Sequence, residues 1–227
     1  MKTKIVQSSG PVVLVGGGEC RDDALTVALA SNSPVVAADG GAAQVLRLGH
    51  MPEAVFGDMD SLSGDIQARL APGVLRPVPE QDSTDFDKCL RHIEAPLVLG
   101  YGFLGARLDH QLAAMNVLVR RPDRRCVLIG PEDVVCLCPP ELTLDLGPGE
   151  RVSLFPLAEA RGQSEGLRWP LDGLRFFPGD AIGTSNEATG PVRLTFGTPS
   201  MLIILSVAHL NALVSGLEHA PRWPARA

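Results

Sequence analysis

Up to about residue 138, the chain alternates short apolar runs with segments of helical spacing, and this alternation limits the possible folds more than any other feature. Residues 11–15 and 34–38 are apolar runs rich in β-branched side chains, and each ends at glycine or aspartate. Such alternation is typical of βαβ units, whose strands are parallel and joined by helices. We therefore predict an α/β fold with a mostly parallel sheet flanked by helices. The predicted strands are residues 11–15, 34–38, 54–56, 74–78, 96–99, 125–129 and 134–138, and the predicted helices are residues 22–30, 42–48, 66–70, 84–93 and 108–119.

After Pro139 and Pro140 the pattern changes to alternating apolar and polar residues, most clearly at residues 192–196. Turn residues also recur at short intervals, a pattern typical of an antiparallel sandwich or barrel. We expect two domains, an α/β domain of residues 1–139 and a smaller all-β domain of residues 140–227. The apolar run at residues 201–207 fits either a buried strand or a short helix.

The composition narrows the class of protein further. The 227 residues carry a net charge of −6, whereas a nucleic-acid-binding surface would be basic. The five cysteines lack Cys-x-x-Cys spacing and favour reduced thiols over disulfides or zinc. The longest apolar run is far shorter than the roughly 20 residues that span a bilayer. We expect a cytoplasmic protein that binds neither nucleic acid nor membrane.

Two aspartates, Asp58 and Asp60, follow the apolar residues 54–57. If the backbone stays extended through Asp60, both side chains point the same way. Like charges this close repel unless protons, hydrogen bonds or a cation stabilise them, and Mg2+ binds through carboxylates and substrate phosphates. The alternative is a turn in which one carboxylate, Ser61 or Ser63 caps the next helix.

Glycine or aspartate also follows three other predicted strands, at residues 16–18, 39–41 and 100–105. In parallel sheets, ligands bind beyond the carboxyl ends of the strands. We therefore predict that these exits, together with residues 58–61, form one cleft.

Polar residues crowd the start of the helix predicted at residues 84–93. Ser83 or Thr84 can cap this helix, and Asp85 interacts favourably with its dipole. A helix N-terminus can also bind phosphate oxygens, which Lys88 one turn later would neutralise. A solvated cap and a phosphate contact are both open interpretations.

A second glycine-containing segment, with Gly102 and Gly105, leads to Arg107, whose guanidinium offers a bidentate fork for phosphate. Asp109 and His110 follow in the first turn of the next predicted helix. Their plain interpretations are a first-turn acid and a half-buried packing residue. For His110 we favour packing over catalysis.

Gly16 and Gly18 offer a competing interpretation. With Asp39 about 20 residues later, they match part of the dinucleotide fingerprint and would suggest an NAD-dependent oxidoreductase. However, Arg21 occupies the third glycine position. NAD binding also gives the later aspartates no role.

Taken in order, these motifs resemble those of the thiamine pyrophosphokinase family over about residues 12–204. The matching segments are Asp39-Gly40-Gly41, Gly57-Asp58-Met59-Asp60-Ser61, Gln81-Asp82-Ser83-Thr84-Asp85-Phe86-Asp87-Lys88, Gly105-Ala106-Arg107-Leu108-Asp109-His110, Gly166-Leu167-Arg168-Trp169-Pro170-Leu171 and Thr184-Ser185-Asn186-Glu187. The sequence departs from the family pattern at Ala106, where a second glycine usually precedes the arginine.

The resemblance implies a homodimer whose first domain binds ATP and whose second domain helps to form the thiamine site across the interface. It implies transfer of the pyrophosphoryl group of ATP to the hydroxyl of thiamine by in-line attack at the β-phosphorus. The implied products are thiamine diphosphate and AMP, and the implied cofactor is Mg2+. A pyrophosphokinase acting on another hydroxymethyl heterocycle, such as a pterin, and a non-catalytic sensor on the same fold are the alternatives.

The same resemblance implies roles for individual residues. The catalytic set is Asp58, Asp60, Asp85, Arg107 and Asp109, of which Asp58, Asp60 and Asp85 would hold Mg2+. The nucleotide would contact Asp39, Gly40, Gly41, Gln81, Ser83, Thr84 and Lys88. The thiamine pocket would be lined by Trp169, Ser185 and Asn186. The Trp169 ring would stack on the cationic heterocycle, and its alternative role is that of a core or interface aromatic.

Overall fold

The computed structural model describes residues 6–105 and 107–226, which form two compact units. The first unit comprises the residues up to Val117 together with Cys126–Pro131. The second comprises Leu118–Arg125 and the residues from Glu132 onward. The departure from the family pattern at Ala106 lies outside the described residues.

The first unit is built on a parallel sheet. Its strands are β2 (Val12–Val15), β3 (Val35–Ala38), β4 (Ala54–Gly57), β5 (Leu75–Pro77), β7 (Val98–Tyr101) and β8 (Cys126–Ile129), in the order β8-β7-β2-β3-β4-β5. All residues of β2, β3 and β4 are buried, as expected for strands covered on both faces. A separate parallel pair joins β1 (Val6–Gln7) to β6 (Ile93–Glu94). The predicted mostly parallel α/β fold is confirmed.

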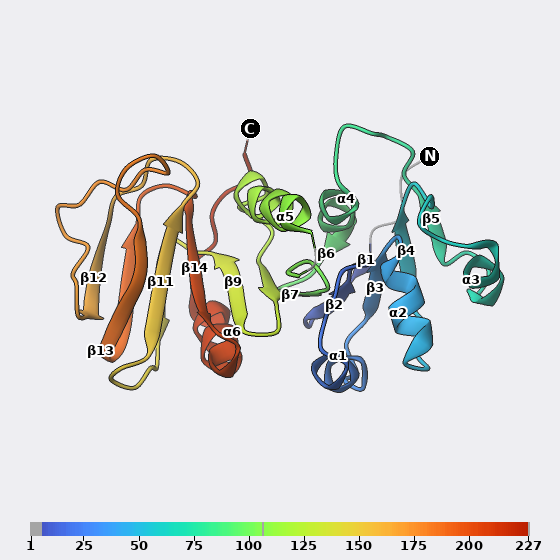
Figure 1. The fold of residues 1–227 in the computed structure, drawn as a ribbon, viewed down its shortest axis with the longest axis horizontal. Coiled ribbons are helices and arrows are strands. Elements are labelled where there is room, and N and C mark those ends of the chain that lie inside the picture. Colours follow the sequence, from blue (N-terminus) through green and yellow to red (C-terminus); the bar gives the residue numbers. More distant parts are fainter. Residues whose placement is uncertain (1–5, 106, 227) are drawn as a thin grey trace. The chain divides into compact units, whose positions relative to one another are not determined.

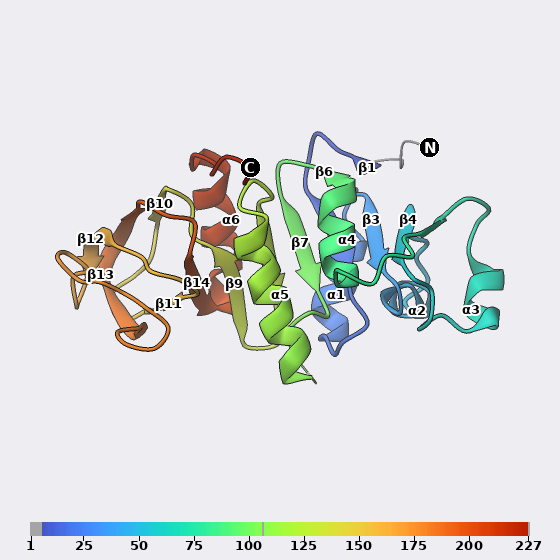
Figure 2. The ribbon, with the colours of Figure 1, turned by 90° about the horizontal axis from the view of Figure 1, so that it is seen from above.

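Helices connect these strands in the predicted positions. They are α1 (Asp22–Leu29), α2 (Gly41–Arg47), α3 (Gly64–Arg69), α4 (Asp85–His92) and α5 (Leu108–Arg120). Figure 1 shows α1 and α2 on one side of the strands and α4 and α5 on the other. The view from above in Figure 2 shows α4 and α5 lying over the strands. The chain therefore builds the sheet outward from β2 to β5 and then returns to the other side of β2. The carboxyl ends of β2 and β7 mark the reversal, where ligands of such sheets bind.

A glycine sets the distance between α2 and the sheet. A Cβ added to Gly41, the first residue of α2, would lie 2.0 Å from the carbonyl oxygen of Val15 in β2. No side chain fits at this position, so the helix start can lie directly against the end of β2 only with glycine there.

The second unit contains antiparallel strands, as predicted. They are β9 (Asp133–Leu137), β10 (Glu141–Leu144), β11 (Arg151–Pro156), β12 (Gly162–Leu167), β13 (Gly183–Phe196) and β14 (Met201–Ser206). The first part of β13 pairs with β11, and its last residues pair with both β10 and β12. Within the ambiguous apolar run at residues 201–207, Met201–Ser206 form β14, and Val207 begins the short 3-10 helix that follows. A domain boundary after residue 139 would place β9 in the first domain, whereas the compact units place it in the second.

One helix of the second unit has no counterpart among the predicted elements. It is α6 (Leu210–His219), which follows the short 3-10 helix η1 (Val207–His209) and contains Gly216. A Cβ on Gly216 would lie 2.5 Å from the carbonyl oxygen of Thr143, so close packing explains a glycine inside a helix. Among the described residues, no helix is both long enough and apolar enough to cross a membrane.

Candidate active site

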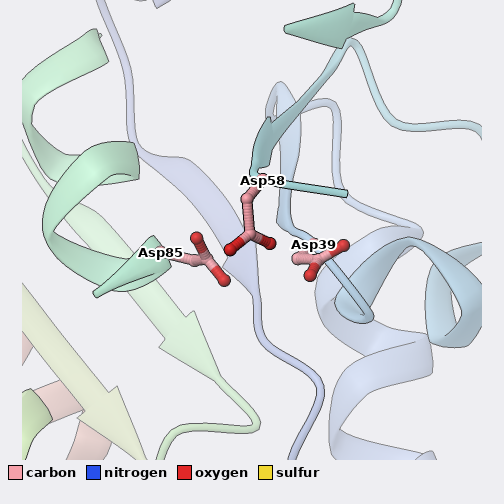
Figure 3. Close-up of side chains that lie close together, drawn as sticks. All are labelled: Asp39, Asp58 and Asp85. Carbon is pink, nitrogen blue, oxygen red and sulfur yellow. The ribbon is translucent and has the colours of Figure 1, made fainter. Parts of the chain in front are cut away.

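Three carboxylates of the first unit meet at the carboxyl ends of its strands. Asp39 follows β3, Asp58 follows β4 and Asp85 is the first residue of α4. One oxygen of each lies within 4.8 Å of the others, and Figure 3 shows the Asp58 carboxylate between the other two. Neighbouring parallel strands bring the first two together, and α4 packs against both strands. We call Asp39, Asp58 and Asp85 the acidic cluster.

Asp39 is the most constrained member of the acidic cluster. Its side chain is buried, and its φ of 39° lies in the left-handed region. Oδ2 accepts a hydrogen bond from the Ser61 backbone N–H at 3.1 Å, whereas Oδ1 is buried and has no hydrogen-bond partner among the described residues. Burial raises the pKa of Asp39, and the charges of Asp85 and Asp58 raise it further against the lowering effect of Ser61.

An unpartnered buried oxygen is costly, and such groups in native proteins usually have a partner. A cation bound by all three carboxylates of the acidic cluster would give Asp39 Oδ1 such a partner. Hard oxygen donors from three carboxylates suit a divalent cation such as Mg2+. The residues of the acidic cluster therefore fit a magnesium ion.

Asp58 is held in position by two hydrogen bonds. Its Oδ1 accepts from the backbone N–H of Asp60 at 3.3 Å, and its Oδ2 accepts from Nε2 of Gln81 at 3.2 Å. These hydrogen bonds lower the pKa of Asp58, with the Asp60 N–H as the largest cause, and the charge of Lys88 lowers it further. These contacts therefore favour the ionised form of Asp58.

Asp60 does not belong to the acidic cluster that the described residues form. The expectation that Asp58 and Asp60 point the same way is wrong, because the backbone does not stay extended. Met59 has a φ of 71°, and the chain turns there. The Asp60 carboxylate is exposed, and the residue contributes its backbone N–H to Asp58 instead.

The start of α4 supplies a cap and a buried cation. Thr84 caps the helix, with Oγ1 accepting from the Asp87 N–H at 3.3 Å. Lys88 Nζ lies 3.0 Å from Oδ1 of Asp85, and the Lys88 side chain is almost completely buried. The capping interpretation of Thr84 is thus correct, and Thr84 also lines the cavity described next.

A cavity of about 670 Å³ opens over the acidic cluster. Among the predicted site residues, its lining includes Asp39, Gly40, Asp58, Gln81, Ser83, Thr84, Asp85, Lys88 and Arg107. Within the part of the chain that the structure describes, Gly41, Asp60 and Asp109 lie outside this lining. The predicted convergence of four strand exits is confirmed, because Gly16, Gly40, Ser61 and Gly102, one residue from each exit, line the same cavity.

Several lining residues had been given other roles from the sequence. Gly16 and Gly18 suggested a dinucleotide site as an alternative to the cleft, and His110 suggested packing, yet all three line this cavity. Phe86 and Phe103 also line it, with ring centroids 4.6 Å apart. Their positions at a helix start and a strand exit are the sequence signal that could have identified the two aromatic rings.

Arg107 and Asp109 form an exposed pair. An Nη atom of Arg107 lies 2.6 Å from Oδ2 of Asp109, and Nε lies 3.1 Å from Oδ1. This hydrogen bonding lowers the pKa of Asp109 and raises that of Arg107. Asp109 therefore orients a guanidinium at the cavity while lying outside the lining itself.

The predicted thiamine residues lie in the second unit, where Asn186 holds the backbone of Trp169. Asn186 Oδ1 accepts from the Trp169 N–H at 3.2 Å, and Nδ2 donates to the Trp169 carbonyl at 2.7 Å. The Trp169 side chain is exposed, and the Arg168 guanidinium carbon lies 4.9 Å from its ring centroid. Ser185 has a φ of 62°, and its N–H donates to Ser153 Oγ at 3.0 Å.

Comparison with known proteins adds independent information. Residues 26–128 match the family model described as the thiamin pyrophosphokinase catalytic domain, and residues 141–201 match the thiamin pyrophosphokinase vitamin B1 binding domain. Thiamine pyrophosphokinase 2 of Arabidopsis thaliana is 30% identical over 196 residues, which cover 78% of this chain and 73% of the relative. The chain belongs to the thiamine pyrophosphokinase family. This membership favours a pyrophosphokinase over an NAD-dependent oxidoreductase.

Other members of the thiamine pyrophosphokinase family agree. Thiamine pyrophosphokinase 1 of Arabidopsis thaliana is 31% identical over 163 residues, so this chain spans 61% of the length of that relative. The crystal structure of yeast thiamin pyrophosphokinase has a TM-score of 0.73 at 16% identity, covering 89% of this chain and 88% of that chain. The structure from Geobacillus thermodenitrificans has a TM-score of 0.71 at 24% identity, covering 89% and 100%. At these identities the structures show the shared fold.

Proposed function

We propose that this chain transfers the pyrophosphoryl group of ATP to the hydroxyl of thiamine by in-line attack at the β-phosphorus. The products are thiamine diphosphate and AMP. The observation that supports this most is the acidic cluster. Among the described residues, its buried Asp39 Oδ1 has no hydrogen-bond partner, and its Asp85 pairs with the buried Lys88. Family membership supplies the substrate class.

We assign Mg2+ to Asp39, Asp58 and Asp85, and this set replaces the predicted Asp58, Asp60 and Asp85. Asp60 acts through its backbone N–H, which helps to keep Asp58 ionised. When bound, the ion would neutralise charge on the phosphate oxygens.

The remaining residues of the cavity position and neutralise the phosphates. Such transfers depend mainly on alignment and charge stabilisation, and the protein need supply no covalent nucleophile. Lys88 supplies a buried positive charge next to Asp85, and the α4 N-terminus at Thr84 adds the positive end of a helix dipole. Arg107, oriented by Asp109, contributes a planar fork from another side of the cavity.

We assign thiamine binding and dimerisation to residues 140–227, with Trp169, Ser185 and Asn186 at the thiamine site. The exposed indole of Trp169 can stack on a cationic heterocycle, as its contact with the Arg168 guanidinium illustrates. We place the homodimeric enzyme in the cytoplasm, since Cys20, Cys89, Cys126, Cys136 and Cys138 are all free thiols.

The direct test supplies the purified chain with ATP, Mg2+ and thiamine and quantifies the products by chromatography. AMP and thiamine diphosphate should appear in equal amounts, and a hydroxymethylpterin offered in place of thiamine should give no AMP. Asp58→Asn and Asp85→Asn should abolish turnover with circular dichroism unchanged, whereas Asp60→Asn should keep measurable activity. ADP as the product, or full activity in both of the first two variants, would contradict the proposal.

A further inference from the structure

Gln44, a residue of α2, ties down the glycine segment that follows β2. Its Nε2 donates to the carbonyl oxygens of Gly16 at 3.0 Å and Gly18 at 2.7 Å. The Sγ of Cys20 lies 3.0 Å from Gln44 Oε1 as a hydrogen-bond donor. Both N–H groups of the Gln44 amide thus donate to the backbone of one short segment, and the amide oxygen accepts from Cys20.

The opposite side of this segment is fixed by backbone. The N–H of Gly16 donates to the Tyr101 carbonyl at 2.8 Å, and the N–H of Gly18 donates to the Gly102 carbonyl at 3.0 Å. A Cβ on Gly18 would lie 2.7 Å from the Gly102 oxygen, so the two strand exits are in direct contact. The N–H of Gly17 differs, because within the described residues it donates to no protein acceptor.

The hydrogen bonds of residues 16–18 determine which of their backbone groups can contact an anion in the cavity. Carbonyl oxygens directed into a phosphate site repel the phosphate, whereas backbone N–H groups bind it. The Gln44 amide holds the carbonyls of Gly16 and Gly18, while Gly17 lines the cavity with its N–H available. The segment also lies at the reversal point of the sheet, where phosphate-bearing ligands bind.

We infer that Gln44 is a positioning residue for the polyphosphate of the nucleotide, acting through the backbone of Gly16, Gly17 and Gly18. This inference rests on the proposed function for the identity of the ligand. Gln44 itself lies outside the cavity lining in the described part of the chain, so its effect on binding would pass through the glycine segment.

The test compares Gln44→Met with Gln67→Met. Methionine keeps the length of the side chain, removes the amide and adds no charge. Gln67 is a matched control, because its Nε2 also donates to a backbone carbonyl, that of Leu62 at 3.0 Å, and it lies outside the cavity lining among the described residues. Titration calorimetry with magnesium and α,β-methylene-ATP, and separately with adenosine, measures the phosphate-dependent part of binding.

Gln44→Met should weaken binding of α,β-methylene-ATP about tenfold, equivalent to about 1.4 kcal/mol, with adenosine binding unchanged. In the assay, the KM for ATP should rise by a similar factor, while the KM for thiamine should not. Gln67→Met should leave all of these values as in the wild type. Equal losses for adenosine and the ATP analogue, or no loss in a folded Gln44→Met, would overturn the inference.

The experiment distinguishes a failure of this inference from a folding defect and from a failure of the proposed function. If Gln44→Met does not fold, Gln44→Ala takes its place, and failure of both variants to fold would overturn a positioning role in favour of a structural one. The calorimetry needs no thiamine, so a chain that binds the ATP analogue but makes no thiamine diphosphate contradicts only the proposed function. A wild-type chain that does not bind the analogue would contradict both.

Discussion

Lys88 Nζ lies 3.0 Å from Asp85 Oδ1 within one turn of α4, and the two side chains differ sharply in exposure, at 2% for Lys88 and 31% for Asp85. The Lys88 ammonium therefore depends more than the Asp85 carboxylate on the ion pair for stabilisation of its charge. If the pair is lost, water can solvate the Asp85 carboxylate readily, whereas Lys88 lines the cavity with only 2% of its side chain exposed.

This asymmetry predicts opposite costs for the two obvious substitutions. Asp85→Asn should lower the free energy of unfolding by about 3 kcal/mol, because it leaves a buried charge without its closest partner. Lys88→Met should keep most of the stability and lose activity by about a hundredfold or more, since the cavity loses a positive charge. Urea unfolding and steady-state kinetics measure the two effects. Equal destabilisation by both variants would contradict the argument.

Asp39→Asn should stabilise the protein in the absence of metal. Burial and two neighbouring carboxylates raise the Asp39 pKa, so its ionised form opposes folding at neutral pH. An asparagine keeps the acceptor for the Ser61 N–H and can donate to a neighbouring carboxylate. The melting temperature in EDTA should rise by about 2–4 °C per kcal/mol gained.

The same variant should lose the response to magnesium. Wild-type protein should melt at a higher temperature in Mg2+ than in EDTA, and Asp39→Asn should show little of this shift. Asp145→Asn is the control, because Asp145 is an exposed aspartate of the second unit. An unchanged magnesium response in Asp39→Asn would remove Asp39 from the proposed metal site.

Gly41→Ala and Gly64→Ala test close packing at two helix starts. Gly41 begins α2 with no room for a Cβ, whereas Gly64 begins α3 with no atom within 4 Å of an added Cβ. Gly41→Ala should cost about 2 kcal/mol or more by forcing α2 away from β2. Gly64→Ala should stabilise the folded protein by about 0.5 kcal/mol, because alanine lowers the conformational entropy of the unfolded chain. Similar melting temperatures for the two variants would contradict this explanation.

The hydrogen-bonded pair of Glu80 and Arg91 should make the free energy of unfolding depend on pH on the acid side. The Arg91 hydrogen bond, followed by that of Ser83, lowers the pKa of Glu80. The unfolded chain therefore binds a proton at a higher pH than the folded chain does. The stability that the pair contributes is present at neutral pH and is lost as the pH falls from the ordinary glutamate range through the lower folded pKa.

Arg91→Met should remove this contribution. Urea unfolding should show that Arg91→Met lowers stability at pH 7 and makes it less dependent on pH on the acid side. Arg193→Met is the matched control, because Arg193 pairs with Glu141 in the second unit without a contact to Glu80. A steeper acid dependence in Arg91→Met than in the wild type would contradict the sign of this argument.

Most strands and helices of the first unit were predictable because its apolar runs are short, continuous and separated by clear turn residues. The two-residue strands β1 and β6 were not predicted, and Ile93, expected at the end of a helix, begins β6. The site was harder to predict, because it depends on backbone angles that the residue pattern does not reveal. The positive φ of Met59 turns Asp60 away, and the position of Asp39 beside β4 brings it to Asp58. The family resemblance identified the aspartates as a group, but it grouped Asp60 with Asp58 and Asp85, whereas the structure brings Asp39 close to those two.

In the second unit, β12 and α6 contain glycines that disfavour the strand and the helix that these segments form. β12 (Gly162–Leu167) contains two glycines and little apolar alternation, and it forms because β13 supplies its partners. α6 contains Gly216, which lowers helix propensity and is required by contact with Thr143. The apolar residues of α6 do recur at helical spacing, at Leu210, Leu213, Val214 and Leu217, so that helix could have been predicted, whereas β12 gave no such signal.

The pairing of the second unit has a consequence for synthesis of the chain. Each of β9, β10, β11 and β12 pairs with β13 or β14, so each waits for residues between Gly183 and Ser206 to leave the ribosome. A nascent chain that stops earlier exposes apolar strand edges, which favour aggregation. A premature stop codon in this stretch is therefore expected to yield an insoluble product and not a shortened enzyme.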